Sequence, residues 1–254
     1  MISLRKVTAG YNGVKIIKNI SISFEKSTIT SIIGKNGCGK TTLLKTSSNL
    51  LKPFFGDVML NNVSLSDMPN NQLAKQISFL PQIRVVPNIT CHNLVMHGRF
   101  PYLGFPRIPQ KADKLIVESA IDKMGITEYK NTNIQELSGG ERQKVYIAMV
   151  LAQDTDIIFL DEPTTYLDIN HQLEILEIIK ELKRIGKTIV MVLHDLSNAL
   201  SYSDKICLME KGEVAIYDTP QAVLDSKELD RIFNVKCERV YVNNRESKQY
   251  FFSL

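Results

Sequence analysis

The chain has no apolar run that approaches the roughly 18 to 20 residues of a membrane-spanning helix. Its N-terminus lacks the basic and apolar regions of a signal peptide, so we expect a soluble protein that stays where it is made. Neither sign of charge is in large excess: 31 basic and 27 acidic residues give a net charge of +4, too small to indicate nucleic-acid binding. Internal repeats and low-complexity segments are also missing. With 254 residues, 44% of them hydrophobic, the chain can form one large α/β domain, or a domain with a small lobe.

Cysteine is scarce and scattered. The four residues Cys38, Cys91, Cys207 and Cys237 form no C-x-x-C pair and have no metal-ligand spacing. This pattern suits a reducing cytosol and argues against a disulfide framework or a zinc site. Cys207 lies in an apolar, strand-like segment and is expected in the core.

The segment Gly34-Lys-Asn-Gly-Cys-Gly-Lys-Thr41 fits the G-x-x-x-x-G-K-[ST] pattern of a phosphate-binding loop. A β-rich run precedes it and a helix is expected to begin at Thr41, which is the context that the motif requires. The glycines let several backbone N–H groups converge on phosphate oxygens. Lys40 would contact the β and γ phosphates and the Thr41 hydroxyl would ligate Mg²⁺. The alternative is a glycine-rich turn that fits the pattern by chance.

A second motif is the apolar run Ile157-Ile-Phe-Leu160, which predicts a buried parallel strand and ends in two carboxylates, Asp161 and Glu162. Carboxylates at the C-terminal end of such a strand lie where open α/β sheets bind ligands. Asp161 would hold Mg²⁺, and Glu162 would polarise the water that attacks the γ-phosphate. A solvated acidic turn after a core strand is the alternative.

A third motif is Leu137-Ser-Gly-Gly-Glu141. Ser138 is a good N-cap and the residues from Glu141 onward have helical periodicity, so a helix N-terminus would face an anion. An ordinary capped helix after a glycine turn is the alternative.

Together the three motifs resemble the nucleotide-binding subunit of an ABC (ATP-binding cassette) transporter, over nearly all of residues 1–235. The resemblance implies an α/β P-loop NTPase fold with a mixed or parallel sheet core, an antiparallel β lobe and a helical signature lobe at about 88–153. It also implies a homodimer in which two MgATP are sandwiched head to tail, so that a lone chain hydrolyses ATP poorly. Residues 236–254 would form a short C-terminal extension, a small hairpin.

Four further positions match the family one at a time. Tyr11 matches the aromatic residue that stacks on adenine, and Gln82 matches the glutamine that senses Mg²⁺ and the attacking water. His194 matches the histidine that contacts the γ-phosphate, and Asp168 matches the loop that crosses to the second subunit. Each has a plainer alternative: an exposed tyrosine beside a turn, a polar loop residue, a structural histidine and a helix cap.

The predicted site follows from these matches. Glu162, His194 and Gln82 are the predicted catalytic residues, and Thr41, Gln82 and Asp161 the predicted metal ligands. The predicted ATP contacts are Tyr11, Gly34, Lys35, Asn36, Gly37, Cys38, Gly39, Lys40, Thr41 and Thr42. The predicted signature contacts to the partner's ATP are Ser138, Gly139, Gly140 and Glu141. Cys38 lies near a helix N-terminus, where its thiolate would be favoured, so we expect alkylation to block ATP binding and MgATP to protect.

The segment from Thr90 to Tyr102 resembles the ATPases of importers for ferric siderophores, haem and cobalamin. Thr90 would cap a short helix, although Asn93 replaces the glutamate of a full capping box. Gly98 and Arg99 would lie on an exposed face that borders a groove for a polytopic permease subunit. The expected protein is thus a peripheral ATPase at the cytoplasmic face of the membrane, serving indirectly an extracytoplasmic solute-binding protein. The alternatives are an ABC ATPase that acts in assembly or as a scaffold, and a P-loop kinase, which would need a lid in place of 137–143.

Periodicity predicts the remaining elements. Half-buried antiparallel strands are expected within residues 1–33 and 56–60, and a helix over 111–124 with Val117, Ala120, Ile121 and Met124 on one face. A core-facing stripe of Ile175, Ile178, Ile179 and Leu182 indicates a second helix. A hairpin around Glu210–Gly212 and a helix opened by Thr219-Pro220 should follow. The last hairpin is expected to pair residues 240–242 with 250–252.

Overall fold

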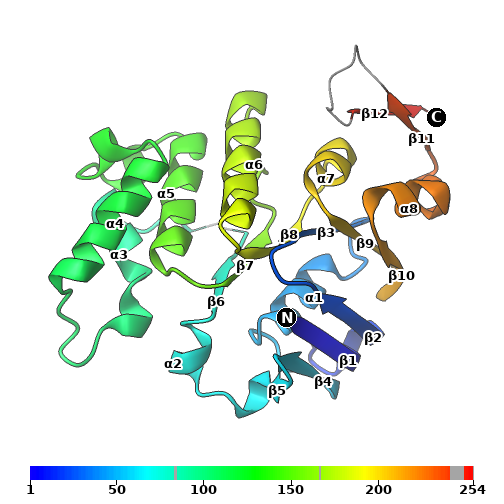
Figure 1. Cartoon of the computed structure of the whole chain (residues 1–254), viewed down its shortest axis with the longest axis horizontal. Coiled ribbons are helices and arrows are strands. Elements are labelled where there is room, and N and C mark those ends of the chain that lie inside the picture. The colour runs from blue at the N-terminus through cyan, green and yellow to red at the C-terminus, as the bar shows by residue number, and fades with distance from the viewer. Residues whose placement is uncertain (83–84, 166, 241–248, 254) are drawn as a thin grey trace. The chain divides into compact units, whose positions relative to one another are not determined.

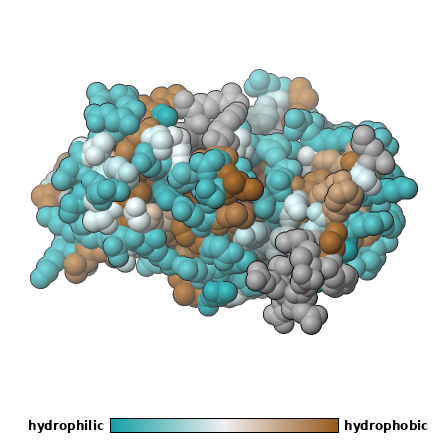
Figure 2. Space-filling model, turned by 90° about the horizontal axis from the view of Figure 1, so that it is seen from above, coloured by the Kyte–Doolittle hydropathy of each residue, from teal (hydrophilic) through white to brown (hydrophobic). Residues whose placement is uncertain are grey.

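The computed structural model describes residues 1–82, 85–165, 167–240 and 249–253. They fall into two compact units, one formed by Met1–Met68 and Ile179–Leu254, the other by Pro69–Ile178. The predicted helical lobe at 88–153 falls within the second unit, and the predicted domain limit at residue 235 stays a prediction. No helix of the described residues is both long and apolar enough to cross a membrane. On the face shown in Figure 2, hydrophobic side chains form separate small patches among hydrophilic ones.

The first unit contains an antiparallel sheet in the order β2-β1-β4-β5 (Figure 1). Its strands are β1 (Ile2–Tyr11), β2 (Val14–Phe24), β4 (Phe55–Leu60) and β5 (Val63–Ser64). The turns Asn12-Gly13 and Asn61-Asn62 both have positive φ angles, which is the backbone of a tight hairpin turn. Burial alternates along β1 except at Arg5–Lys6 and Ala9–Gly10, so the predicted half-buried strands are confirmed.

A second group of strands in this unit is parallel at its centre. It consists of β3 (Ile29–Gly34), β8 (Thr188–Val192), β9 (Lys205–Glu210) and β10 (Glu213–Asp218). Strand β3 pairs in parallel with both β8 and β9, and β10 pairs antiparallel with β9. Every residue of β3 and β8 is buried, as expected for parallel strands covered on both faces. The unit's helical segments are α1 (Lys40–Ser47), η1 (Leu65–Asp67), α7 (Leu196–Tyr202), α8 (Pro220–Asp225) and α9 (Glu228–Phe233).

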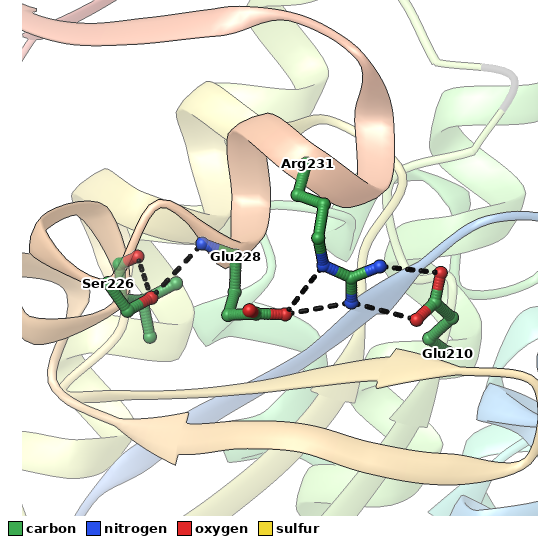
Figure 3. A network of polar contacts seen from close by, with 5 residues as sticks. Glu210, Ser226, Glu228 and Arg231 are labelled. Carbon is green, nitrogen blue, oxygen red and sulfur yellow. Dashed lines mark hydrogen bonds and ion pairs between the residues drawn. The ribbon is translucent and has the colours of Figure 1, made fainter.

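Helix α9 is held to the end of β9 by one arginine (Figure 3). The two Nη atoms of Arg231 lie 3.3 and 2.8 Å from the carboxylate oxygens of Glu210. Its Nε and Nη2 lie 3.1 and 2.8 Å from Glu228 Oε2 on the same helix. The guanidinium therefore joins a helix to a strand.

The chain ends in the antiparallel pair β11 (Lys236–Val240) and β12 (Gln249–Ser253), with Val240 opposite Gln249. The first strand begins at Lys236, before the predicted 240–242, and shares only Val240 with it, while the predicted 250–252 lies within β12. Residues 241–248 of the predicted hairpin lie outside the described residues. The hairpin β9–β10 and the opening of α8 by the Thr219 cap and Pro220 are confirmed.

The second unit is mainly helical. Its elements are α2 (Asn70–Leu73), β6 (Ile77–Leu80), α3 (Cys91–His97), η2 (Phe100–Tyr102), α4 (Lys111–Lys123), η3 (Thr127–Tyr129), η4 (Ile134–Glu136), α5 (Gly139–Ala152) and β7 (Ile157–Asp161). Helix α6 (Ile169–Arg184) begins here and its last residues belong to the first unit. Strand β7 is fully buried and parallel to β6, as predicted. The predicted apolar face of α4 is buried at all four positions.

The expectation that Gly98 and Arg99 form an exposed face is wrong. A Cβ at Gly98 would lie 2.2 Å from the Met149 carbonyl oxygen, so α3 touches the backbone of α5 at this point. Arg99 is only 6% exposed, and its Nε donates to Asp113 Oδ1 at 3.0 Å. Its Nη1 also donates to the Ala152 carbonyl at 2.9 Å. The ion pair and these hydrogen bonds offset part of the desolvation cost of burying Arg99, and they tie α4 and α5 together.

Candidate active site

The phosphate-binding loop lies between β3 and α1 in the first unit, in the predicted strand–loop–helix context. Gly34 has φ 151°, and a Cβ there would lie 2.4 Å from the Met209 carbonyl and 2.7 Å from Cys38 Sγ, so this position admits only glycine. Lys40 is 7% exposed, and its Nζ donates to the carbonyls of Gly34 and Lys35 at 2.8 and 3.2 Å. The two carbonyls hold the ammonium against the loop. Lys35, Asn36 and Gly37 are exposed, so the tip of the loop is open.

Cys38 differs from expectation. Its side chain is buried at 6% exposure, and burial raises the pKa of its thiol despite the opposing charge of Lys40. Desolvation of the thiolate outweighs the positive potential of the loop. The expectation of a favoured thiolate is therefore wrong, whereas the block of ATP binding by alkylation and the protection by MgATP stay predictions. The predicted burial of Cys207 is confirmed.

Two more predicted residues lie in the same unit. Strands β3 and β8 pair in parallel with Ile32 opposite Val192, so the phosphate loop and the exposed His194 leave the same edge of the strands. Tyr11 is 43% exposed at the tip of the β1–β2 hairpin. A Cβ at Gly39 would lie 2.9 Å from the Ile17 side chain, so β2 borders the start of α1. The hairpin that carries Tyr11 therefore adjoins the loop.

The two carboxylates of the second motif lie at the end of β7, where Asp161 is the last residue of the strand and Glu162 follows it. Asp161 is 3% exposed, while Glu162 is partly exposed and has φ 55°. Leu80 of β6 lies opposite Leu160 of β7. Gln82 and Glu162 each come two residues after this pair, so they leave neighbouring strands at the same level. Their side chains meet: Gln82 Nε2 donates to Glu162 Oε2 at 2.7 Å. Two residues predicted separately as catalytic are thus in direct contact.

The signature residues form a capped helix N-terminus. Ser138 Oγ accepts from the Glu141 backbone N at 3.3 Å, and Glu141 Oε2 accepts from the Ser138 backbone N at 2.8 Å, which is a complete capping box. The pKa of the Glu141 carboxyl is lowered, mainly by its hydrogen bonds with Ser138 and also by one with Tyr129. Ser138 and Gly139 are exposed, so this end of α5 faces solvent.

Asp168 also caps a helix. Its Oδ1 accepts from the backbone N of His171 at 3.0 Å, at the start of α6, and its Oδ2 lies 2.7 Å from His171 Nδ1. Both bonds lower the pKa of the Asp168 carboxyl. The cap alternative is therefore correct for the isolated chain, and a contact with a second subunit stays a prediction.

Sequence reasoning missed two residues at these motifs. Thr165 Oγ1 donates to Glu162 Oε2 at 3.1 Å, so Glu162 has a second donor besides Gln82. His171 reaches Asp168 through its ring nitrogen. Both lie three residues after the carboxylate they contact, a spacing that places a donor beside an acceptor in a turn, and this is the signal that could have found them.

Comparison with known proteins agrees with this geometry. Residues 17–165 match the family described as ABC transporter. The petrobactin import ATP-binding protein FpuD of Bacillus anthracis is 41% identical over 236 residues, covering 92% of this chain and 86% of that protein. The iron(3+)-hydroxamate import ATP-binding protein FhuC of Bacillus subtilis (strain 168) is 41% identical over 242 residues, covering 94% and 90%.

A solved structure is similar as well. The dimeric, post-hydrolysis structure of the ATP-binding cassette MJ0796 bound to ADP and Pi aligns with a TM-score of 0.76 at 28% identity. The alignment covers 87% of this chain and 99% of that one. The P-loop ATPase fold expected from the motifs is thereby confirmed.

Proposed function

Since this chain belongs to the ABC transporter family as an ATP-hydrolysing, ATP-binding subunit, we propose that two copies of it energise a membrane importer for an iron chelate. The relatives described above are named for petrobactin and iron(3+)-hydroxamate import, which supports an iron–siderophore cargo over haem or cobalamin. Their match covers more than nine-tenths of this chain, and this observation carries the proposal. The partners would be polytopic permease subunits and, indirectly, an extracytoplasmic solute-binding protein. The subunit would lie peripherally at the cytoplasmic face of the membrane.

The nucleotide would be held by the phosphate loop. Backbone N–H groups of residues 34–42 would surround the phosphates, and Lys40 would turn from the Gly34 and Lys35 carbonyls to the phosphate oxygens. Tyr11 would stack on adenine and His194 would contact the γ-phosphate.

The residues proposed for Mg²⁺ fit a hard cation. Thr41, Gln82 and Asp161 offer a hydroxyl, an amide and a carboxylate oxygen, which are the ligand types that Mg²⁺ prefers. The ion would neutralise charge on the β and γ phosphates.

Hydrolysis would rely on Glu162. Its carboxylate would accept a proton from the attacking water, while the hydrogen bonds from Gln82 and Thr165 fix its orientation. A base held in one orientation needs no rearrangement when the water arrives.

Dimer closure would couple ATP binding to transport. The start of α5 offers the backbone N–H groups of Gly139 and Gly140 and a helix dipole, which can seal the γ-phosphate of the partner's ATP. The N–H groups of Ser138 and Glu141 stay in the capping box. ATP that binds the closed dimer more tightly than the open one shifts the equilibrium towards closure, and hydrolysis reverses it.

Replacement of the proposed base tests this mechanism. Glu162→Gln should keep ATP binding, lower turnover by about 10²-fold or more, and accumulate an ATP-bound dimer in size-exclusion chromatography. Glu136→Gln makes the same exchange at an exposed position and should behave as wild type in ATP binding, turnover and dimer accumulation. Turnover near the wild-type rate in Glu162→Gln would rule out Glu162 as the base.

The cellular role is tested separately. Affinity purification from solubilised membranes should recover a polytopic permease with the tagged chain. Recovery of soluble partners alone would favour the assembly or scaffold role.

A further inference from the structure

The ring of His171 packs on the backbone of Gly140. A Cβ placed on Gly140 would lie 3.0 Å from both Cγ and Cδ2 of His171 and 3.2 Å from its Nδ1. That spacing is tighter than ordinary van der Waals contact. The absence of a side chain at Gly140 therefore allows the imidazole to lie against the signature turn.

The same ring contacts Asp168. Its Nδ1 lies 2.7 Å from Asp168 Oδ2, and the His171 side chain is 31% exposed. Gly140 belongs to the start of α5 and Asp168 precedes α6, so two segments far apart in sequence meet on one side chain. All three residues belong to the second unit.

A helix cap alone does not require this ring. Capping of α6 uses the bond from the His171 backbone N to Asp168 Oδ1, and any residue other than proline at position 171 supplies that N–H. The second bond, to Oδ2, and the contact with Gly140 belong to the imidazole. These two contacts join the Asp168 segment to the signature residues, and capping of α6 does not account for them.

We infer that His171 is a positioning residue for ATP hydrolysis. It holds the loop at Asp168, which is predicted to cross to the second subunit, and the signature turn, Ser138 to Glu141, as one rigid piece. The inference rests on the proposed function, in which both segments face the partner's nucleotide. Because His171 joins the two segments, they move together when the dimer closes. Both then reach the partner's ATP and the partner's catalytic groups in the correct relative position. Small misplacements of such groups cost large factors in rate, so the loss of the bridge acts on turnover.

Three substitutions of His171 separate its contacts. His171→Ala removes both, His171→Phe keeps a ring near Gly140 but cannot donate to Asp168, and His171→Asn places an amide N–H close to the position of Nδ1. We expect kcat of the full-length chain to fall about tenfold in the Ala and Phe variants, and KM for ATP to rise as well, because the closed dimer then needs more ATP to form. His171→Asn should recover much of kcat. Asn170→Ala, at an exposed position of the same helical turn, is the matched control and should behave as wild type.

Dimer formation distinguishes this inference from the proposed function. Glu162→Gln should dimerise with ATP, and His171→Ala added to it should raise the ATP concentration needed about tenfold. If Glu162→Gln alone does not dimerise, the proposed function is overturned. If it dimerises equally well with and without His171→Ala, or if His171→Phe matches wild type in kcat, the role of His171 alone is overturned. Thermal melting of each variant identifies loss of fold. If His171→Ala does not fold, the comparison of kcat between His171→Asn and His171→Phe decides whether the bond to Asp168 matters.

Discussion

Among the glycines of the second unit, Gly98 leaves the least room for an added side chain. A methyl group there would lie 2.2 Å from the Met149 carbonyl oxygen, a backbone atom that cannot move aside alone. Gly98→Ala should therefore lower the free energy of unfolding by about 1–3 kcal/mol, since overpacking outweighs the gain in helix propensity. Denaturation in urea measures it.

The control for Gly98 is Gly104, where an added Cβ meets nothing within 4 Å and φ is not positive. Gly104→Ala should stay within about 0.5 kcal/mol of wild type. Equal stability of the two variants would show that α3 and α5 can separate at this point without cost.

Local chemistry explains which residues could be predicted. Thr90, Ser138 and Thr219 were recognised as helix caps, and all three accept the expected backbone N–H, because a cap depends on its nearest neighbours in sequence. Arg99 and Cys38 were misjudged because their burial depends on distant partners. The partner of Arg99 is Asp113, and the chain that encloses Cys38 includes Gly34 and the turn at Gly212. No local pattern carries that information.

Secondary-structure elements are joined by contacts that respond to pH, and Arg231 is the clearest example. Its guanidinium lowers the pKa of Glu210 from an ordinary 4.5 and so links β9 to α9. A lowered carboxyl pKa contributes stability that is fully present above the unfolded pKa and is lost as the pH falls through the folded pKa. The contribution is therefore complete at pH 7 and declines below about pH 4.5.

Arg231→Gln tests this link. We expect the variant to unfold at lower urea than wild type at pH 7, with the difference shrinking below pH 4.5 as Glu210 becomes protonated. The effect should be small, because the groups are exposed and screened by solvent. Lys236→Gln, which also removes one exposed positive charge, should show no such convergence. A difference that stays constant across this pH range would assign the effect of Arg231 to packing.

Elements were predictable where a period was clear. Of the predicted stripe along α6, Ile175, Ile179 and Leu182 are buried, while Ile178 is only partly buried. The apolar runs of β7 and β8 are parallel strands. The limits of the units were not, because the division falls inside α6, between Ile178 and Ile179, where neither composition nor periodicity changes. The division between the units depends on tertiary contacts, which the local sequence does not show. The start of β11 at Lys236 was missed for a similar reason, since its alternation is short and mixed with charge.

At the scale of the whole molecule, the expectation that two copies share each ATP comes from the resemblance to the family, since a single chain contains only one half of each such site. Ser138 caps α5, and Glu141 of the same chain completes the capping box, while Ser138 and Gly139 remain exposed. In the proposed dimer, the exposed N-terminal end of α5 would contact the partner's ATP. Gly139 is a suitable point for a test, because a Cβ there meets nothing within 4 Å and its φ is ordinary.

Mixing two inactive variants tests the sharing of ATP between copies. Gly139→Glu should fold normally, since an acid in the first helical turn suits the dipole, yet its charge would repel a partner's γ-phosphate. Lys40→Ala would lose phosphate binding in the same chain. Each variant alone should be inactive. In an equal mixture about half of the dimers are mixed, and each has one intact site, so ATPase activity should return to about a quarter of wild type if the sites act independently. Mixing Gly139→Glu with a Gly139→Glu, Lys40→Ala double variant leaves no intact site and should stay inactive. If the first mixture is as inactive as the second, the prediction that a dimer with one intact shared site hydrolyses ATP is wrong.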